Sequence, residues 1–240
     1  MTPEERSSSL PPDVAGPPGH LLRKVAHDIT GPAGVAAGAL KELETALGEH
    51  AAAHATMLSL AFRSLQRLER LAKRLRLTAM LHDGVLELDS EPLLVGEIVE
   101  KAVAGASRLD GRKNVTLEGP EVPAGVRVRA DKDHLAFALG ELVSNSFRFA
   151  RQRVRVGGVR EGDTLALIFE DDGPGYPAGF AEALQRGGNA IPGESGLALP
   201  IVTSLATRFG GRLVLGPSTL VTAKDKRPGA MARLELPVVV

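Results

Sequence analysis

Four short segments carry the side chains that could do chemistry, and the first surrounds His27. In the heptad pattern of its helix, His27 falls on the side away from the apolar residues, so we expect an exposed imidazole. The carboxylate of Asp28 can accept one ring proton and leave the other nitrogen nucleophilic. Pro32 follows and removes a backbone hydrogen bond. A single exposed histidine is more often an ordinary surface residue, so this segment needs the support of the others.

The second segment contains Glu141, Asn145 and Arg148, spaced i, i+4 and i+7. In a helix this spacing places all three side chains on one face. An amide oxygen beside a cation suits hydrated Mg²⁺ and the phosphates that accompany it. The alternative is an exposed polar stripe on an amphipathic helix.

The third segment is a turn that begins at Asp171 and Asp172, directly after an apolar strand, and contains Gly173 and Gly175. A carboxylate held at a strand end by a rigid turn can accept a hydrogen bond from an amino group such as that of adenine. Asp, Gly and Pro are also the residues expected in an ordinary turn that ends a strand.

The fourth segment is a glycine-rich stretch that includes Gly193 and Gly196 and leads into an apolar helix. Backbone N–H groups at a helix N-terminus can bind phosphate. Neither the P-loop spacing nor the dinucleotide-binding spacing is present. The alternative is a surface loop capped by glycine.

Two long helical segments must position His27. Residues 21–47 and 51–81 both place apolar side chains at alternating spacings of three and four, and Gly48 lies between them. In the first segment these side chains form one stripe of three adjacent rows. The rows are Leu22, Ile29, Ala36 and Leu43; Val25, Pro32, Ala39 and Ala46; Ala26, Ala33, Leu40 and Leu47. A hairpin of two such helices buries its seam best by pairing as a four-helix bundle, so we predict a homodimer.

After residue 84 strand patterns alternate with helix patterns. The expected strands are residues 85–89, 114–119, 126–131, 153–159, 164–171, 211–216 and 230–239. The expected helices are residues 93–109, 131–150 and 196–209. This order predicts an α+β protein, in which the helical hairpin precedes an α/β sandwich with one sheet face covered by helices. Residues 1–19 are polar and Pro-rich and are expected to be a disordered leader.

The composition excludes several classes of function. The chain has no cysteine, and its 29 basic residues equal its 29 acidic residues. These features exclude disulfides and thiolate metal sites and argue against nucleic acid as a partner. No apolar run approaches the roughly 20 residues that cross a bilayer, so no membrane insertion is expected. We expect the protein to be cytoplasmic.

Together and in this order, the four segments resemble those of the two-component histidine kinases. VAHDITGP resembles the phospho-acceptor box, ELVSNSFRFA the asparagine box, DDGPG the first glycine box and GESGLALPIV the second. The resemblance runs from about residue 20 to the C-terminus. It implies a dimerisation and phosphotransfer hairpin in residues 20–84 and a GHKL-type catalytic ATP-binding domain in residues 85–240. It also implies a response-regulator receiver domain as partner and, upstream, a possible sensor protein.

The resemblance assigns a role to each matched residue. His27 is the phosphorylated nucleophile and Asp28 its general base. Asn145 holds Mg²⁺, and Asp171 binds the adenine amino group of ATP. The other residues that it implies lie around the nucleotide: Glu141 near the metal, Arg148 near the phosphates, Gly173 and Gly175 in the adenine turn, and Gly193 and Gly196 in the phosphate-covering lid.

Departures from the family pattern leave alternatives open. Glu194 and Ala198 replace usual glycines, and the lid is short. One alternative is a histidine phosphotransferase whose kinase-like domain has lost ATP binding. A protein-serine kinase of the same ATPase superfamily is another, but it needs no histidine hairpin. Gly31, before Pro32, has no side chain to position a water, so we expect weak phosphatase activity toward the partner.

Overall fold

The structure is a computed structural model of the 240-residue chain. It describes residues 19–110, 114–185, 197–221 and 228–239. The chain divides between Val85 and Leu86 into two compact units. The change of pattern in the sequence predicts a division after residue 84.

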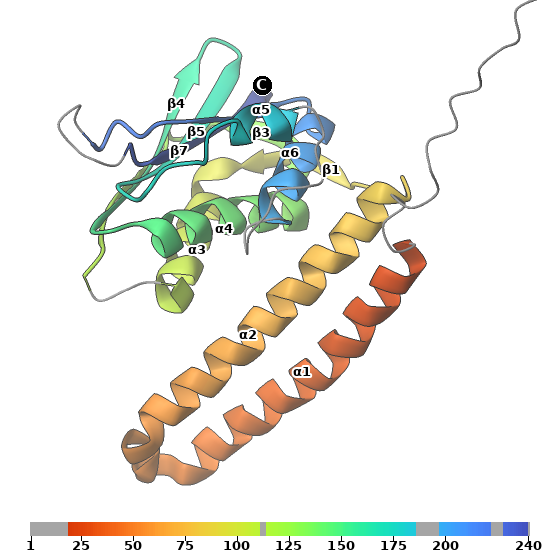
Figure 1. The fold of residues 1–240 in the computed structure, drawn as a ribbon, viewed down its shortest axis with the longest axis vertical. Helices are drawn as coiled ribbons and strands as arrows, with labels where there is room; N and C mark the ends of the chain where they lie inside the picture. The colour runs from red at the N-terminus through yellow and green to blue at the C-terminus, as the bar shows by residue number, and fades with distance from the viewer. Residues whose placement is uncertain (1–18, 111–113, 186–196, 222–227, 240) are drawn as a thin grey trace, which may run out of the picture. The chain divides into compact units, whose positions relative to one another are not determined.

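The first unit is a helical hairpin. Helix α1 (Gly19–Leu47) and helix α2 (Ala51–His82) are joined by the 3₁₀ turn η2 (Gly48–His50) and pack along each other (Figure 1). Gly48 has a φ of +50°, the left-handed conformation predicted for the residue that ends the first helix. At the open end of the hairpin the guanidinium of Arg23 pairs with the carboxylate of Asp83.

The three predicted apolar rows of α1 differ in exposure. Ala26 and Ala33 are buried, whereas Val25 and Leu43 are 41% and 49% exposed. Large apolar side chains of α2 are exposed as well: Met57, Leu60, Leu68 and Leu71. The hairpin of one chain therefore leaves apolar side chains of both helices uncovered, as a helix pair that packs on a further partner would do.

The second unit is a mixed sheet with helices on one face (Figure 1). The strand order is β1-β3-β7-β5-β4-β2, and β6 also pairs with β7. The pair β2–β4 is parallel and the other pairs are antiparallel. The strands are β1 (Ser90–Leu94), β2 (Thr116–Glu121), β3 (Arg127–Asp131), β4 (Arg153–Glu161), β5 (Thr164–Asp171), β6 (Arg212–Gly216) and β7 (Ala230–Val239). The helices are α3 (Val95–Asp110), α4 (Lys132–Phe149), α5 (Phe180–Gln185) and α6 (Ala198–Arg208).

Alternation along the central strands separates the two faces of the sheet. In β5 the side chains of Leu165, Leu167 and Phe169 are at most 1% exposed and belong to the core on which the helices pack. Ile168 in β5 and Arg233 in β7 lie opposite each other on the open face. This arrangement confirms the predicted α+β fold with one covered sheet face.

Two local predictions are wrong, and one element was not predicted. Residues 85–89 form no strand, and β1 is the following segment, Ser90–Leu94. Pro92 lies within β1, which is possible because β1 is an edge strand that pairs only with β3. The next helix begins at Val95, two residues later than expected. Helix α5 was not predicted, because its six residues are too few to show a helical repeat.

Candidate functional site

His27 lies in α1, and its side chain is 90% exposed, as predicted. The Oδ1 atom of Asp28 is 3.6 Å from its Nδ1 atom. That distance is too long for a hydrogen bond, but it places the carboxylate on the Nδ1 side of the ring. The other ring nitrogen, Nε2, lies away from this carboxylate and is the candidate nucleophile.

Helix α1 continues through Pro32 without interruption. Because proline has no N–H, the carbonyl of Asp28 lacks its usual helical donor four residues on. At Gly31 an added Cβ would meet no atom within 4 Å, so the space beside this position is open. Pro32, about one turn beyond His27, therefore frees the backbone acceptor of the adjacent Asp28 and does not end the helix.

In the second unit, Asp131 fixes the start of α4. Its Oδ1 accepts hydrogen bonds from the backbone N–H groups of Asp133 and His134, both at 3.0 Å. Burial raises the pKa of the Asp131 carboxyl, but these donors and the nearby His134 ring outweigh it and hold the pKa below its usual range. The capped helix buries Leu135 and Leu139 completely, which sets the rotation of α4.

The rotation of α4 places the three predicted polar side chains away from open solvent. Glu141 is only 2% exposed, and Asn145 and Arg148 are half-buried. An exposed polar stripe is therefore excluded as the explanation of this spacing. The Arg148 guanidinium lies 5.3 Å from the ring centroid of Phe149, whose side chain is 40% exposed.

Asp171 is the last residue of β5 and is 3% exposed. Its Oδ1 accepts a hydrogen bond from the N–H of Gly173 at 2.8 Å, and the N–H of Ala230 also donates to its carboxylate. Burial raises the pKa of Asp171 to about 6, and the charges of Asp172 and Glu170 act in the same direction. Above that pH the site presents a buried carboxylate, which is a strong acceptor for an amino group.

Asp172 has a different role from Asp171. Its Oδ1 accepts from the backbone N–H groups of Arg151, Gln152 and Arg153, at 2.8, 2.9 and 3.1 Å. Burial raises the pKa of Asp172, but these donors prevail and hold it below the usual range. Asp172 therefore fastens the turn to the segment after α4. This role of Asp172 was not predicted from the sequence, in which its only sign is that it directly follows another aspartate.

Glycine is required at both predicted turn positions. A Cβ on Gly173 would lie 2.3 Å from the carbonyl oxygen of Phe149, the last residue of α4. Gly175 has a φ of +79°, and its Cβ would lie 2.6 Å from Cγ of Pro228 and 2.8 Å from the oxygen of Gly229. The end of α4, the turn after β5 and the connection before β7 are thus in close contact.

Gly193 and Gly196 lie outside the described residues. Helix α6 begins at Ala198, which is fully buried, and packs on α4.

In the described part of the chain no three His, Cys, Asp or Glu side chains cluster as metal ligands. Of the predicted residues, Asn145 supplies an amide oxygen that suits Mg²⁺, a cation that usually needs few protein ligands because phosphates and water complete its shell.

Among the helices that the structure describes, none combines the length and the apolar character needed to span a bilayer.

Known proteins resemble this chain in sequence and fold. Residues 130–240 match the family described as Histidine kinase-, DNA gyrase B-, and HSP90-like ATPase. Sensor protein PhoQ of Escherichia coli O157:H7 is 23% identical over 150 residues, which are 61% of this chain and 30% of that protein. Virulence sensor histidine kinase PhoQ of Salmonella typhimurium is 21% identical over 207 residues, which are 85% of this chain and 41% of that protein. The chain thus spans less than half the length of these relatives.

The solved structure of full-length ShkA in complex with AMPPNP has a similar fold, with a TM-score of 0.62 and 20% identity. The similarity covers 92% of this chain and 46% of that one. Motif order, the ATPase family match and the sensor-kinase relatives agree with one another. Residues 130–240 thus match a GHKL-type ATP-binding domain, and together these findings support a two-component histidine kinase.

Proposed function

We propose that this chain uses Mg-ATP to phosphorylate its own His27 and then passes the phosphoryl group to an aspartate of a response regulator. The observation that carries the proposal is the buried Asp171 carboxylate in a turn where the neighbouring chain leaves room only for glycine. A buried carboxylate is costly, so its presence indicates a functional partner. An exocyclic amino group of adenine suits it.

The nucleotide would lie along α4 and the turn after β5. Asp171 accepts the adenine amino group, and the half-buried Asn145 and Arg148 face the phosphates. Glu141 orients groups beside Asn145, and Gly193 and Gly196 belong to the phosphate-covering lid. The AMPPNP complex of ShkA, which shares the fold, supports ATP as the ligand. Bound Mg²⁺ would neutralise phosphate charge.

In the proposed reaction, Nε2 of His27 attacks the γ-phosphorus, and the N–P bond forms as the P–O bond to ADP breaks. The imidazole gains positive charge in this step. Asp28, 3.6 Å from Nδ1, stabilises that charge and accepts the Nδ1 proton. Because the reaction consumes ATP, we place both units in the cytoplasm.

The uncovered apolar side chains of the hairpin support a homodimer. Val25 and Leu43 of α1 are exposed and belong to the predicted stripe, and exposed leucines of α2 add to the apolar surface. Two hairpins pairing through these side chains form a four-helix bundle, which removes the apolar area from water.

Basic side chains of α2 could receive the response regulator. Its receiver domain must present an acidic phospho-acceptor pocket, and opposite charge promotes encounter between the two proteins. The basic residues of α2 are Arg63, Arg67, Arg70, Lys73, Arg74 and Arg76.

Incubation with Mg²⁺ and γ-labelled ATP tests the proposal. We expect label on the native protein and none on the His27→Ala or Asn145→Ala variants, although His27→Ala should still bind ATP. If the native protein neither binds ATP nor acquires label, but accepts a phosphoryl group on His27 from another protein, it is a phosphotransferase and not a kinase.

A further inference from the structure

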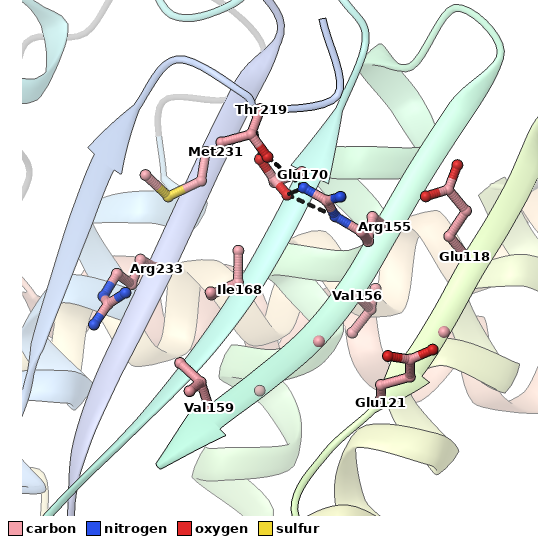
Figure 2. A pocket seen from close by; sticks show the side chains of 13 residues that line it. Glu118, Glu121, Arg155, Val156, Val159, Ile168, Glu170, Thr219, Met231 and Arg233 are labelled. Carbon is pink, nitrogen blue, oxygen red and sulfur yellow. Dashed lines mark hydrogen bonds and ion pairs between the residues drawn. The ribbon is translucent and has the colours of Figure 1, made fainter. Parts of the chain in front are cut away.

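Glu170 lies one residue before Asp171 in β5, so its side chain points to the opposite, open face of the sheet. A glutamate on an open sheet face is normally exposed, yet Glu170 is only 2% exposed. Arg155 of β4 and the segment after β6 cover it. Figure 2 shows its carboxylate between Arg155 and Thr219, at the edge of a hollow of about 440 Å³.

Both oxygens of Glu170 are used as acceptors. Oε1 accepts from the backbone N–H of Thr219 at 2.6 Å and from the hydroxyl of Ser218 at 3.4 Å. Oε2 accepts from Nε of Arg155 at 2.9 Å and from Nη2 of the same guanidinium. Burial raises the pKa of Glu170, but these donors prevail and hold it below its usual range, so the carboxylate is ionised.

The segment that Glu170 holds also forms part of the wall around the predicted adenine turn. The N–H of Ser218 donates to the carbonyl of Pro228 at 3.1 Å. A Cβ on Gly229 would lie 2.6 Å from Cβ of Ser218 and 2.4 Å from the carbonyl oxygen of Asp171. Pro228 and Gly229 in turn contact Gly175. Glu170 is therefore connected to the turn by packed contacts through the β6–β7 connection.

We propose that Glu170 is a positioning residue for nucleotide binding, because it holds Ser218 and Thr219 so that Ser218, Pro228 and Gly229 stay packed on the Asp171–Gly175 turn. The inference rests on the proposed function of that turn in binding ATP. Thr219 and Arg155 donate to different oxygens of Glu170, and glutamine replaces one of these oxygens by an NH₂ group that cannot accept. One set of donors then loses its partner, and the connection is held less firmly.

The charge of Glu170 has a second effect on the turn. Burial is the main cause that raises the pKa of Asp171 to about 6, and the charge of Glu170 acts in the same direction. Removing the charge by Glu170→Gln lowers that pKa, so ATP binding should persist to lower pH. Ser218→Ala, which loosens the same contact without removing a charge, separates this effect from a change in packing.

The test is the Mg-ATP dissociation constant of the full chain, measured by calorimetry between pH 5 and pH 8. We expect Glu170→Gln to weaken Mg-ATP binding at pH 7.5 by about tenfold. We also expect the acid limb, the loss of binding as pH falls, to move to lower pH in this variant. Ser218→Ala removes the hydroxyl that donates to Glu170 and accepts from the N–H of Leu220, but it removes no charge. Binding should therefore weaken about threefold, and the pH below which binding is lost should not change. The control is Glu235→Gln on β7, whose carboxylate pairs with Arg233 and Arg212 and not with the β6–β7 connection.

If Glu170→Gln binds Mg-ATP as tightly as the native protein and loses binding at the same pH, the inference is overturned and the proposed function remains intact. An equal loss in Glu235→Gln would overturn it too, because any outward glutamate would then have the same effect. If Glu170→Gln does not fold, Ser218→Ala decides: weaker binding supports the inference, and native affinity contradicts it. Failure of the native protein to bind Mg-ATP would refute the proposed function, and the inference with it.

Discussion

Replacing Asp171 with asparagine should change how the stability of the second unit depends on pH. In the folded protein burial raises the pKa of Asp171 from 3.8 to about 6. The folded state therefore binds this proton more tightly than the unfolded state does. The group contributes a stabilisation that grows as pH falls through 6 and levels off near pH 4, where the unfolded chain is protonated as well. Asparagine cannot titrate, so the variant lacks this contribution.

The magnitude follows from the two pKa values. A difference of about two units corresponds to about 3 kcal/mol when both limits are reached. Between pH 7.5 and pH 5 the native protein should gain about 1.4 kcal/mol relative to Asp171→Asn. Because both proteins share every other carboxyl group, the difference between their stabilities isolates the contribution of Asp171.

The assay uses the only tyrosine. The chain has no tryptophan, and Tyr176 directly follows Gly175 and stacks on Phe180 with ring centroids 5.6 Å apart. Tyrosine fluorescence during urea unfolding therefore reports on the second unit, next to the turn. The free energy of unfolding is measured for both proteins at pH 7.5, 6 and 5. If the free energies of unfolding of the two proteins change with pH in parallel, the buried-carboxylate argument is refuted. If the native protein becomes more stable than Asp171→Asn as pH rises, the predicted sign is wrong.

Three further substitutions have defined outcomes. Leu43→Glu should convert the dimer to monomer in sedimentation velocity, because it places a charge in the proposed bundle interface. Gly173→Ala should destabilise the second unit by about 2–4 kcal/mol in urea unfolding and abolish ATP binding, because its Cβ has no room. Gly31→Thr should speed the loss of label from a phosphorylated receiver domain, because it adds a hydroxyl in open space near His27.

Each of these substitutions has a control or a contrary result. Val35→Glu alters a side chain that is 75% exposed and outside the apolar stripe, so it should stay dimeric; a dimeric Leu43→Glu would contradict the bundle. Gly140→Ala meets no atom within 4 Å in α4 and should stabilise by about 0.5–1 kcal/mol. Equal stability of Gly173→Ala and Gly140→Ala would contradict the steric argument. Rapid receiver dephosphorylation by the native protein would refute the expectation for Gly31.

The elements that the sequence predicts well are those with a long repeat or a sharp end. The apolar rows of α1 run until Gly48, and the structure ends α1 at Leu47. The segment before Asp171 is apolar from Leu165 to Phe169, and β5 includes it. The segment 85–89 alternates in the same way as a strand but has no neighbour to pair with. Ser90–Leu94 pairs with β3 instead. A local apolar pattern contains no information about which of the two segments pairs with β3.

The roles of the acidic residues around the turn depend on distant segments. Three acids, Glu170, Asp171 and Asp172, follow one another in the sequence. Asp172 binds N–H groups of residues 151–153, and Glu170 is covered by Ser218 and Thr219. Only the folded chain brings these donors to the end of β5. The sequence could therefore identify the turn, but it could not assign a separate role to each carboxylate.

The most direct test of the central claim is to identify the phosphorylated atom after incubation of the native protein with Mg-ATP. We expect a phosphoryl group on the His27 ring, detected in the peptide that contains it. The bond should be lost in acid, retained in base, and absent from the Asn145→Ala variant. A bond that is lost in base, or label confined to a peptide without His27, would contradict the account.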